Sequence, residues 1–171
     1  MKALNLRRRT SQSDLATTQM LTFPFIIPGS DQKVLNLVLK QKTMSRIIIN
    51  TPNAPAPVGA YNQAIVHNGV LYASGQIALD PATGELLTSD IEAETRRVMD
   101  NLGAVLEAGG SSFANVIRCS VFISDMENFG RINTVYASYF DEATAPARAL
   151  VEVANLPKYV NVEISCIAAV G

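Results

Sequence analysis

Short runs of mainly apolar residues, separated by turn-forming residues, recur along the chain and are typical of β-strands. The first stretch covers residues 46–49, and two more cover residues 64–67 and 70–75. Asn68-Gly69 separates the latter two, and this dipeptide between apolar runs favours the tight turn of a β-hairpin. The pattern therefore predicts a single strand followed by a hairpin.

Two other stretches repeat their apolar residues at the 3.6-residue period of an α-helix. The first follows Ser89, which forms a capping-box pattern with Glu92, and it ends at Gly109-Gly110. Its apolar face contains Ile91, Val98, Leu102, Val105 and Leu106. The second helix is expected to begin near Ser124. Its apolar face contains Phe129, Ile132, Tyr136, Tyr139 and Phe140.

Three further strands complete the predicted elements. Residues 116–123 alternate between the two helices, and residues 149–153 and 160–169 follow the second helix, joined by a turn at 155–158. The residues expected on one face of the first of these strands are Ile117, Cys119, Val121 and Ile123. The order strand, hairpin, helix, strand, helix, hairpin predicts an α+β fold with both helices on one face of the sheet.

The last two strands place polar residues on the sheet face away from the helices. If they pair as a hairpin that buries both apolar sets, Leu150 lies opposite Glu163 and Arg148 lies opposite Ser165. Arg148 and Glu163 would then be diagonal neighbours, within reach of each other's long side chains. An exposed ion pair on a sheet surface is the alternative interpretation of these two residues.

Leu150 and Ile167 would make the same face partly apolar, so we expect a second copy of the chain to cover it. Enclosure would desolvate the arginine and the glutamate, and a guanidinium recognises a carboxylate most strongly in such surroundings. This expectation favours a binding site over a solvated ion pair.

Composition excludes several classes of protein. The chain has 171 residues, of which 48% are hydrophobic and 17% are charged, an ordinary globular balance. No apolar run reaches the roughly 18–20 residues of a membrane-spanning helix, so an integral membrane protein is excluded. His67 is the single histidine, and Cys119 and Cys166 have no CxxC spacing, so we expect no metal site.

Charge divides the chain into two parts. Residues 1–43 contain seven lysines and arginines and two acidic residues. Residues 44–171 contain seven lysines and arginines and thirteen acidic residues, a net charge of −6. The first part, a basic extension, is interpreted either as a targeting segment or as sequence upstream of a true start at Met44. Residues 44–171 form the predicted folded domain, whose negative charge disfavours nucleic acid as a partner.

Five motifs in the folded domain match a known family. They are residues 53–61 (NAPAPVGAY), 74–77 (SGQI), 146–153 (PARALVEV), 156–158 (LPK) and 162–164 (VEI). With these motifs in this order, the chain from residue 47 to residue 170 resembles the RidA (YjgF/YER057c/UK114) family of enamine/imine deaminases. The resemblance includes no part of residues 1–43.

The resemblance implies a chorismate-mutase-like homotrimer with inward-facing sheets and active sites in clefts between subunits. It implies hydrolysis of short-lived 2-imino acids, such as 2-iminobutanoate and 2-iminopropanoate, to 2-oxo acids and ammonia, without a metal or organic cofactor. We expect a cytoplasmic protein, or a mitochondrial or plastid one if residues 1–43 are a transit peptide. Neither a nucleic acid nor a membrane is an expected partner.

The resemblance also implies roles for individual residues. Arg148 would bind the substrate carboxylate, because its planar, permanently charged fork can donate two parallel hydrogen bonds. Glu163 would hold or deprotonate the attacking water and manage the proton at the imine nitrogen. The remaining positions that match the family's pocket lining are Tyr61, Ser74, Gly75 and Asn133.

Two positions depart from the family pattern, and two other functions stay open. Ala60 stands where a proline is usual, and Leu150 stands where a cysteine is frequent, which makes the pocket more apolar. The altered pocket is compatible with a member of the family that binds small carboxylates without turnover. A ribonuclease or translation inhibitor is a third possibility, which the net charge of residues 44–171 disfavours.

Overall fold

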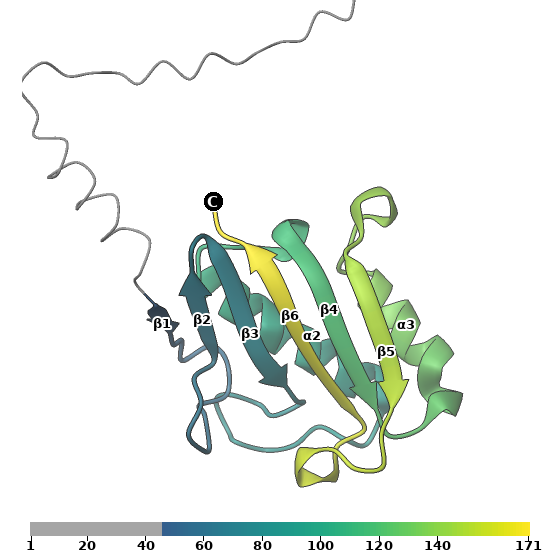
Figure 1. Cartoon of the computed structure of the whole chain (residues 1–171). Coiled ribbons are helices and arrows are strands. Elements are labelled where there is room, and N and C mark those ends of the chain that lie inside the picture. Colours follow the sequence, from purple (N-terminus) through teal and green to yellow (C-terminus); the bar gives the residue numbers. More distant parts are fainter. Residues whose placement is uncertain (1–45) are drawn as a thin grey trace, which may run out of the picture.

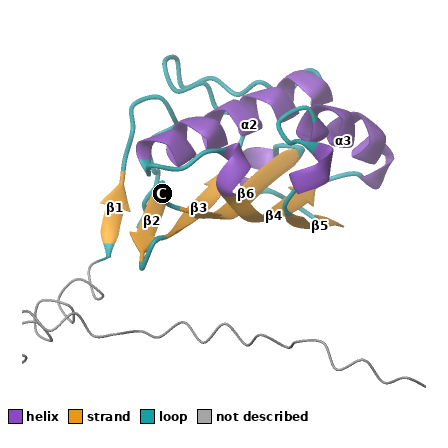
Figure 2. Ribbon diagram, turned by 90° about the horizontal axis from the view of Figure 1, so that it is seen from above, coloured by secondary structure: helices purple, strands orange, loops and turns teal. Residues whose placement is uncertain are grey.

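The computed structural model describes residues 46–171, so the predictions for residues 1–43 lie outside the described part of the chain. Six strands form one sheet in the order β1-β2-β3-β6-β4-β5. Both long helices, α2 and α3, cover the same face of this sheet, as Figure 2 shows, which confirms the predicted α+β layers. Within residues 46–171, no helix combines the length and apolar character needed to cross a membrane.

The first three strands follow the sequence pattern. β1 (Ile47–Ile49) pairs with β2 (Ala64–His67), and β2 forms the predicted hairpin with β3 (Val70–Gln76). The turn residues Asn68 and Gly69 have positive φ angles of 52° and 75°. Two successive positive φ angles define the turn type that matches strand twist, which explains why Asn-Gly is favoured here.

Both helices are present, and the start of each differs from the prediction. α2 (Ile91–Ala108) is capped by Asp90 instead of Ser89, since the Asp90 carboxylate accepts hydrogen bonds from the backbone of Glu92 and Ala93. A carboxylate also interacts favourably with the helix dipole at this end. The second helix begins as a short 3₁₀ turn, Met126–Asn128, and continues as α3 (Phe129–Ala137).

β4 (Val116–Ile123) has the predicted bounds, but one residue predicted on its core face is exposed. Its register against β6 shifts between Val116 and Arg118, which is the mark of a β-bulge. As a result Val116 is buried, and Ile117, expected in the core, is 52% exposed.

The predicted pairing of the last two strands is wrong. β5 (Ala147–Glu152) lies at the sheet edge and pairs in parallel with β4, through a crossover that contains α3. β6 (Val162–Ala169) is inserted between β3 and β4, so β4 separates it from β5, as Figure 1 shows. The segment between β5 and β6 therefore passes the C-terminal end of β4 instead of closing a hairpin.

This topology places Arg148 and Glu163 on opposite faces of the sheet. In the register of β4, Arg148 lies beside Cys119, whose buried side chain faces the helices, and Leu150 lies beside Val121, which is buried there too. Glu163 lies opposite Phe122 and alternates with the buried residues of β6, so it faces away from the helices. The expectation that Arg148 and Glu163 are diagonal neighbours within one chain is therefore wrong.

The core fills the space between the sheet and the two helices. Its largest fully buried apolar side chains are Leu71, Met99, Leu102, Leu106, Ile123, Ile132 and Ile164. The opposite face of the sheet, here called the open face, is partly apolar as expected, although Leu150 does not contribute to it. Tyr72 and Val151 are 47% and 44% exposed there, and Ile167 is half-buried.

Candidate active site

Four of the six predicted site residues come together at the open face. Tyr61, Ser74, Gly75 and Glu163, here called the glutamate half-site, line one cavity of about 420 Å³. Ser74 and Gly75 lie near the end of β3, and Glu163 lies at the start of the neighbouring strand β6. The other lining residues are Val58, Ile77, Pro157 and Lys158.

Gly75 is required because the Glu163 carboxylate packs against it. A Cβ atom added at position 75 would overlap with the carboxylate of Glu163. The β3–β6 register is irregular between Ala73 and Gln76, so the backbone near Gly75 departs from regular strand pairing at this point. A residue without a side chain thus makes room for the one carboxyl group of the cavity.

Burial changes the acidity of that carboxyl group. Glu163 is half-buried, and this burial raises the pKa of its carboxyl above the ordinary value because it penalises the charged form. A half-buried carboxyl beside a cavity can both accept and return a proton in one reaction cycle. The glutamate half-site therefore has the chemistry of an acid–base centre.

The Ser74 hydroxyl is already engaged as a donor. Its Oγ donates to the backbone oxygen of Asn62 over 2.6 Å, and its backbone N–H donates to the oxygen of Gln63 over 2.9 Å. The oxygen atom of the hydroxyl retains acceptor capacity toward the cavity. Ser74 is thus suited to accept a hydrogen bond from a ligand N–H or O–H and unsuited to act as an activated nucleophile.

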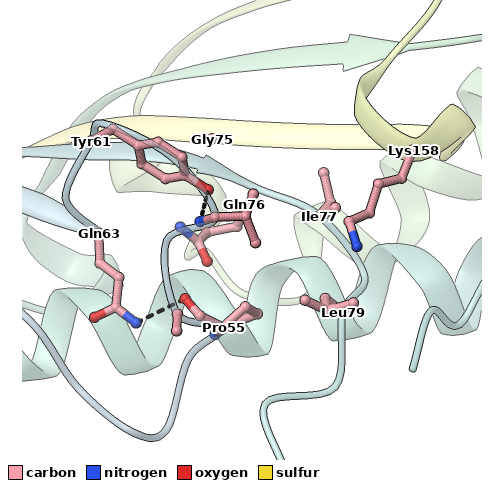
Figure 3. Close-up of a pocket in the computed structure, with 10 residues that line it drawn as sticks. Pro55, Tyr61, Gln63, Gly75, Gln76, Ile77, Leu79 and Lys158 are labelled. Carbon is pink, nitrogen blue, oxygen red and sulfur yellow. Dashed lines mark hydrogen bonds between the residues drawn. The ribbon is translucent and has the colours of Figure 1, made fainter. Parts of the chain in front are cut away.

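Tyr61 lies on a loop that a buried glutamine holds in place. Gln63, 2% exposed, donates from its Nε2 to the backbone oxygens of Thr51, Ala54 and Pro55 at 2.9–3.0 Å. The Tyr61 hydroxyl accepts a hydrogen bond from the backbone N–H of Val58, and its ring is 47% exposed. The dashed line at the Tyr61 hydroxyl in Figure 3 marks this bond. The sequence reasoning missed Gln63, although a polar residue directly before an apolar strand is a usable signal.

The other two predicted residues lie together on the helix side of the edge strand β5. The Arg148 guanidinium donates to Asn133 Oδ1 over 2.8 Å, and its central carbon lies 4.7 Å from the centre of the Tyr136 ring. Asn133 and Tyr136 both belong to α3. These three residues are here called the arginine half-site, and Tyr136, predicted only as a core residue, supports the guanidinium by a cation–π contact.

The arginine half-site leaves most of its donors available. Arg148 is exposed, and the hydrogen bond to Asn133 uses one of the five N–H groups of the guanidinium. A planar guanidinium fixed on one side by an amide and below by an aromatic ring can present its remaining edge to a carboxylate. Within one chain, however, it faces away from the Glu163 cavity.

Leu150 and the cysteines are packing residues. Leu150 is partly buried against the core two residues after Arg148. Cys119 and Cys166 are buried and lie directly opposite each other in the β4–β6 pair. Burial raises the pKa of both thiols, to about 12 for Cys166, which keeps them protonated and unreactive at neutral pH.

Comparison with known proteins places the fold and the motifs in one family. The family described as Endoribonuclease L-PSP matches residues 51–170. A RutC family protein from Synechocystis is 53% identical over 126 residues, which are 73% of this chain and 97% of that protein. The 2-iminobutanoate/2-iminopropanoate deaminase of Rattus norvegicus is 41% identical over 126 residues, 74% of this chain and 91% of that protein.

A solved structure agrees with this result. The crystal structure of Escherichia coli TdcF with bound serine has a TM-score of 0.69 and 39% sequence identity, covering 73% of this chain and 99% of that one. The family match at residues 51–170 includes the strands from β2 to β6, both helices and all six predicted site residues. The chain therefore belongs to the Endoribonuclease L-PSP family, the family of YjgF and RidA.

Proposed function

We propose that this protein hydrolyses short 2-imino acids to 2-oxo acids and ammonia, at sites formed where two copies of the chain meet. The observation that carries the proposal is the division of the predicted residues into two incomplete half-sites on opposite sheet faces. The family also contains mammalian relatives named 2-iminobutanoate/2-iminopropanoate deaminases, which supports the reaction class.

Assembly would complete the site. A carboxylate ligand needs the guanidinium of Arg148, and proton transfer needs the carboxyl of Glu163, yet one chain holds them on opposite faces. The open face is partly apolar, with Tyr72, Val151 and Ile167 available for contact with another copy. A cyclic homotrimer in which the arginine half-site of one copy borders the glutamate half-site of the next satisfies both requirements.

In this arrangement the residues divide the reaction between them. Arg148 binds the α-carboxylate of the imino acid, and Asn133 fixes the orientation of the guanidinium. Glu163 takes a proton from water while the water oxygen attacks the C=N carbon, and it returns the proton to the nitrogen. Glu163 then takes the proton of the carbinolamine hydroxyl and passes it to the amine nitrogen as the C–N bond breaks and the C=O bond forms, so one imino acid and one water give one 2-oxo acid and one ammonia.

The remaining residues of the glutamate half-site position the imine. The Ser74 oxygen can accept a hydrogen bond from the imine N–H, because its own proton is committed to Asn62. Tyr61 covers the cavity from the loop that Gln63 anchors. An imine is already electrophilic when protonated, so positioning of water and substrate can supply much of the acceleration.

A coupled assay tests this function. A threonine dehydratase generates 2-iminobutanoate, and formation of 2-oxobutanoate is followed with and without the protein. We expect the wild type to accelerate the formation of 2-oxobutanoate and Arg148→Ala to lose this effect. Equal rates with the wild type and Arg148→Ala would overturn the proposal.

A second candidate is binding of small carboxylates without turnover. The crystal structure of TdcF with bound serine favours this candidate. Calorimetry with serine and 2-oxobutanoate, combined with the coupled assay, separates the two candidates. Binding that depends on Arg148 without any change in imine hydrolysis would support the second.

We further propose that RNA is not a substrate, despite the family's description. The described domain lies within residues 44–171, whose net charge of −6 repels a phosphate backbone. RNA cleavage that persists at high salt and after removal of residues 1–43 would contradict this proposal.

A further inference from the structure

Lys158 occupies a strained loop at the edge of the glutamate half-site. Its φ angle is 56° and that of Tyr159 is 57°, so two successive residues with side chains adopt the left-handed conformation. This conformation is costly for residues other than glycine and persists where the surroundings impose it, frequently at functional sites. The short helical turn Pro157–Tyr159 contains both residues, and two residues separate it from β6, the strand of Glu163.

The strained loop places Lys158 beside two neighbouring cavities. Lys158 lines the cavity of about 420 Å³ with Glu163, and it also lines a smaller cavity of about 40 Å³ with Tyr61, Ile77 and Leu79. Figure 3 shows its side chain extending from the loop toward Ile77 and Leu79. The apolar stem can rest on these residues while the ammonium group stays in solvent at the rim.

Lys158 shares its larger cavity with one acidic residue and forms no salt bridge with it. Glu163 is the one acid and Lys158 the one base in the two linings. The salt bridges formed within residues 46–171 involve Arg97 and Arg131 and do not include Lys158.

The net negative charge of the domain disfavours the approach of an anionic substrate. Residues 44–171 carry a net charge of −6, and Lys158 is the single lysine of this range. A negative surface repels the carboxylate of an imino acid, and a local positive charge at the entrance offsets that repulsion. Charges that act across solvent in this way are screened by salt.

We propose that Lys158 is a specificity-determining residue that attracts the carboxylate of the substrate to the cavity entrance before Arg148 of a second copy binds it. The proposal rests on the proposed function, because it assigns the first encounter of that site's substrate. Lys158 selects anionic ligands over neutral ones of the same shape and takes no part in proton transfer.

The test compares Lys158→Met, which keeps the apolar stem, with Arg96→Gln, which removes one exposed positive charge from α2 and lines neither cavity. For each variant, kcat/KM for imine hydrolysis is measured from about 10 mM to about 1 M salt, across which the Debye length falls from about 30 Å to about 3 Å. Calorimetric binding of 2-oxobutanoate is measured over the same series.

At low salt we expect Lys158→Met to lower kcat/KM and 2-oxobutanoate affinity about 5-fold, the effect of one screened charge at several ångströms. The loss shrinks as salt rises, so the variant and the wild type converge near 1 M. Arg96→Gln keeps the wild-type dependence of kcat/KM on salt concentration, and Lys158→Arg restores this dependence. The thermal midpoint of Lys158→Met stays near that of the wild type.

Two results would overturn this role for Lys158. One is a dependence of kcat/KM on salt in Lys158→Met that equals the wild-type dependence. The other is a loss of kcat/KM in Lys158→Met that stays constant up to 1 M salt, which would indicate a structural role. If the wild type hydrolyses no imine, the proposed function fails, and the salt dependence of 2-oxobutanoate binding still decides the role of Lys158.

Discussion

The two half-sites hold their charged groups by different means. The glutamate half-site is built from backbone and a cavity, in which Glu163 packs against Gly75 and is half-buried. The arginine half-site is built from side chains on an exposed edge, in which Asn133 and the Tyr136 ring hold Arg148. Burial adjusts the proton affinity of the carboxyl, whereas exposure leaves the guanidinium donors available to a ligand.

Removal of the acid–base group from the glutamate half-site is expected to have the largest effect. Glu163→Gln keeps the shape of the side chain but cannot take a proton from water, so we expect kcat/KM to fall about 10²–10⁴-fold. Affinity for 2-oxobutanoate, measured by calorimetry, stays close to that of the wild type because Arg148 is unchanged. Retention of wild-type turnover would remove Glu163 from the reaction.

At the arginine half-site we expect a substitution to lower the affinity for the ligand, which the substitution of Glu163 leaves unchanged. Arg148→Met removes the carboxylate partner, at a cost of about 2–3 kcal/mol in binding, or roughly 30–150-fold in 2-oxobutanoate affinity. Arg148→Lys keeps the charge without the planar fork, so we expect an intermediate loss. An Arg148→Met variant with unchanged affinity would mean that another group binds the carboxylate.

The contact between Gly75 and Glu163 provides a smaller, purely steric test. Gly75→Ala places a Cβ where the Glu163 carboxylate lies and displaces it, so we expect kcat to fall about 10–100-fold. Gly130→Ala is the matched control, because a Cβ there meets no atom within 4 Å. Full activity in Gly75→Ala would show that the position of the Glu163 carboxylate is not critical.

The raised pKa of Glu163 gives the smallest expected effect, a displaced pH profile. Glu163 must be ionised to accept a proton, and burial raises its pKa. The midpoint of the acidic limb of the kcat/KM profile should therefore lie at a pH above the ordinary glutamate pKa of about 4.3. A profile of kcat/KM from pH 4 to pH 8 measures this limb. A limb at or below the ordinary value would contradict the effect of burial.

Stability should respond to the same group with a defined sign. Because the folded-state pKa of Glu163 is raised, its protonated form favours the folded state below the unfolded-state pKa. This contribution is lost as pH rises through the folded-state pKa. Relative to Glu163→Gln, the wild type should therefore lose stability across that interval, measured by urea unfolding.

Local patterns predicted the elements, whereas strand order required long-range information. The hairpin at Asn68-Gly69, the long helix α2 and the bounds of β4 follow from features a few residues apart. Alternation in β5 and β6 shows which residues share a face of one strand, but it identifies neither the neighbouring strand nor the face that the helices cover. This is why Arg148 and Leu150 were assigned to the wrong face.

The site was predicted in part for the same reason. Its six residues follow from the resemblance to a family, and four of them line one cavity. The reason for glycine at position 75 is a contact between residues 88 positions apart, which no local pattern contains. Similarly, nothing in the sequence signals the left-handed conformation of Lys158.

Complementation between variants tests most directly whether the two half-sites act across copies of the chain. Arg148→Met and Glu163→Gln, each with the activity loss expected above, are mixed in equal amounts, and two different affinity tags confirm subunit exchange. If each site takes Arg148 from one copy and Glu163 from the next, random mixing restores about a quarter of the wild-type rate per subunit. A mixture as inactive as its two parents would contradict a site shared between copies.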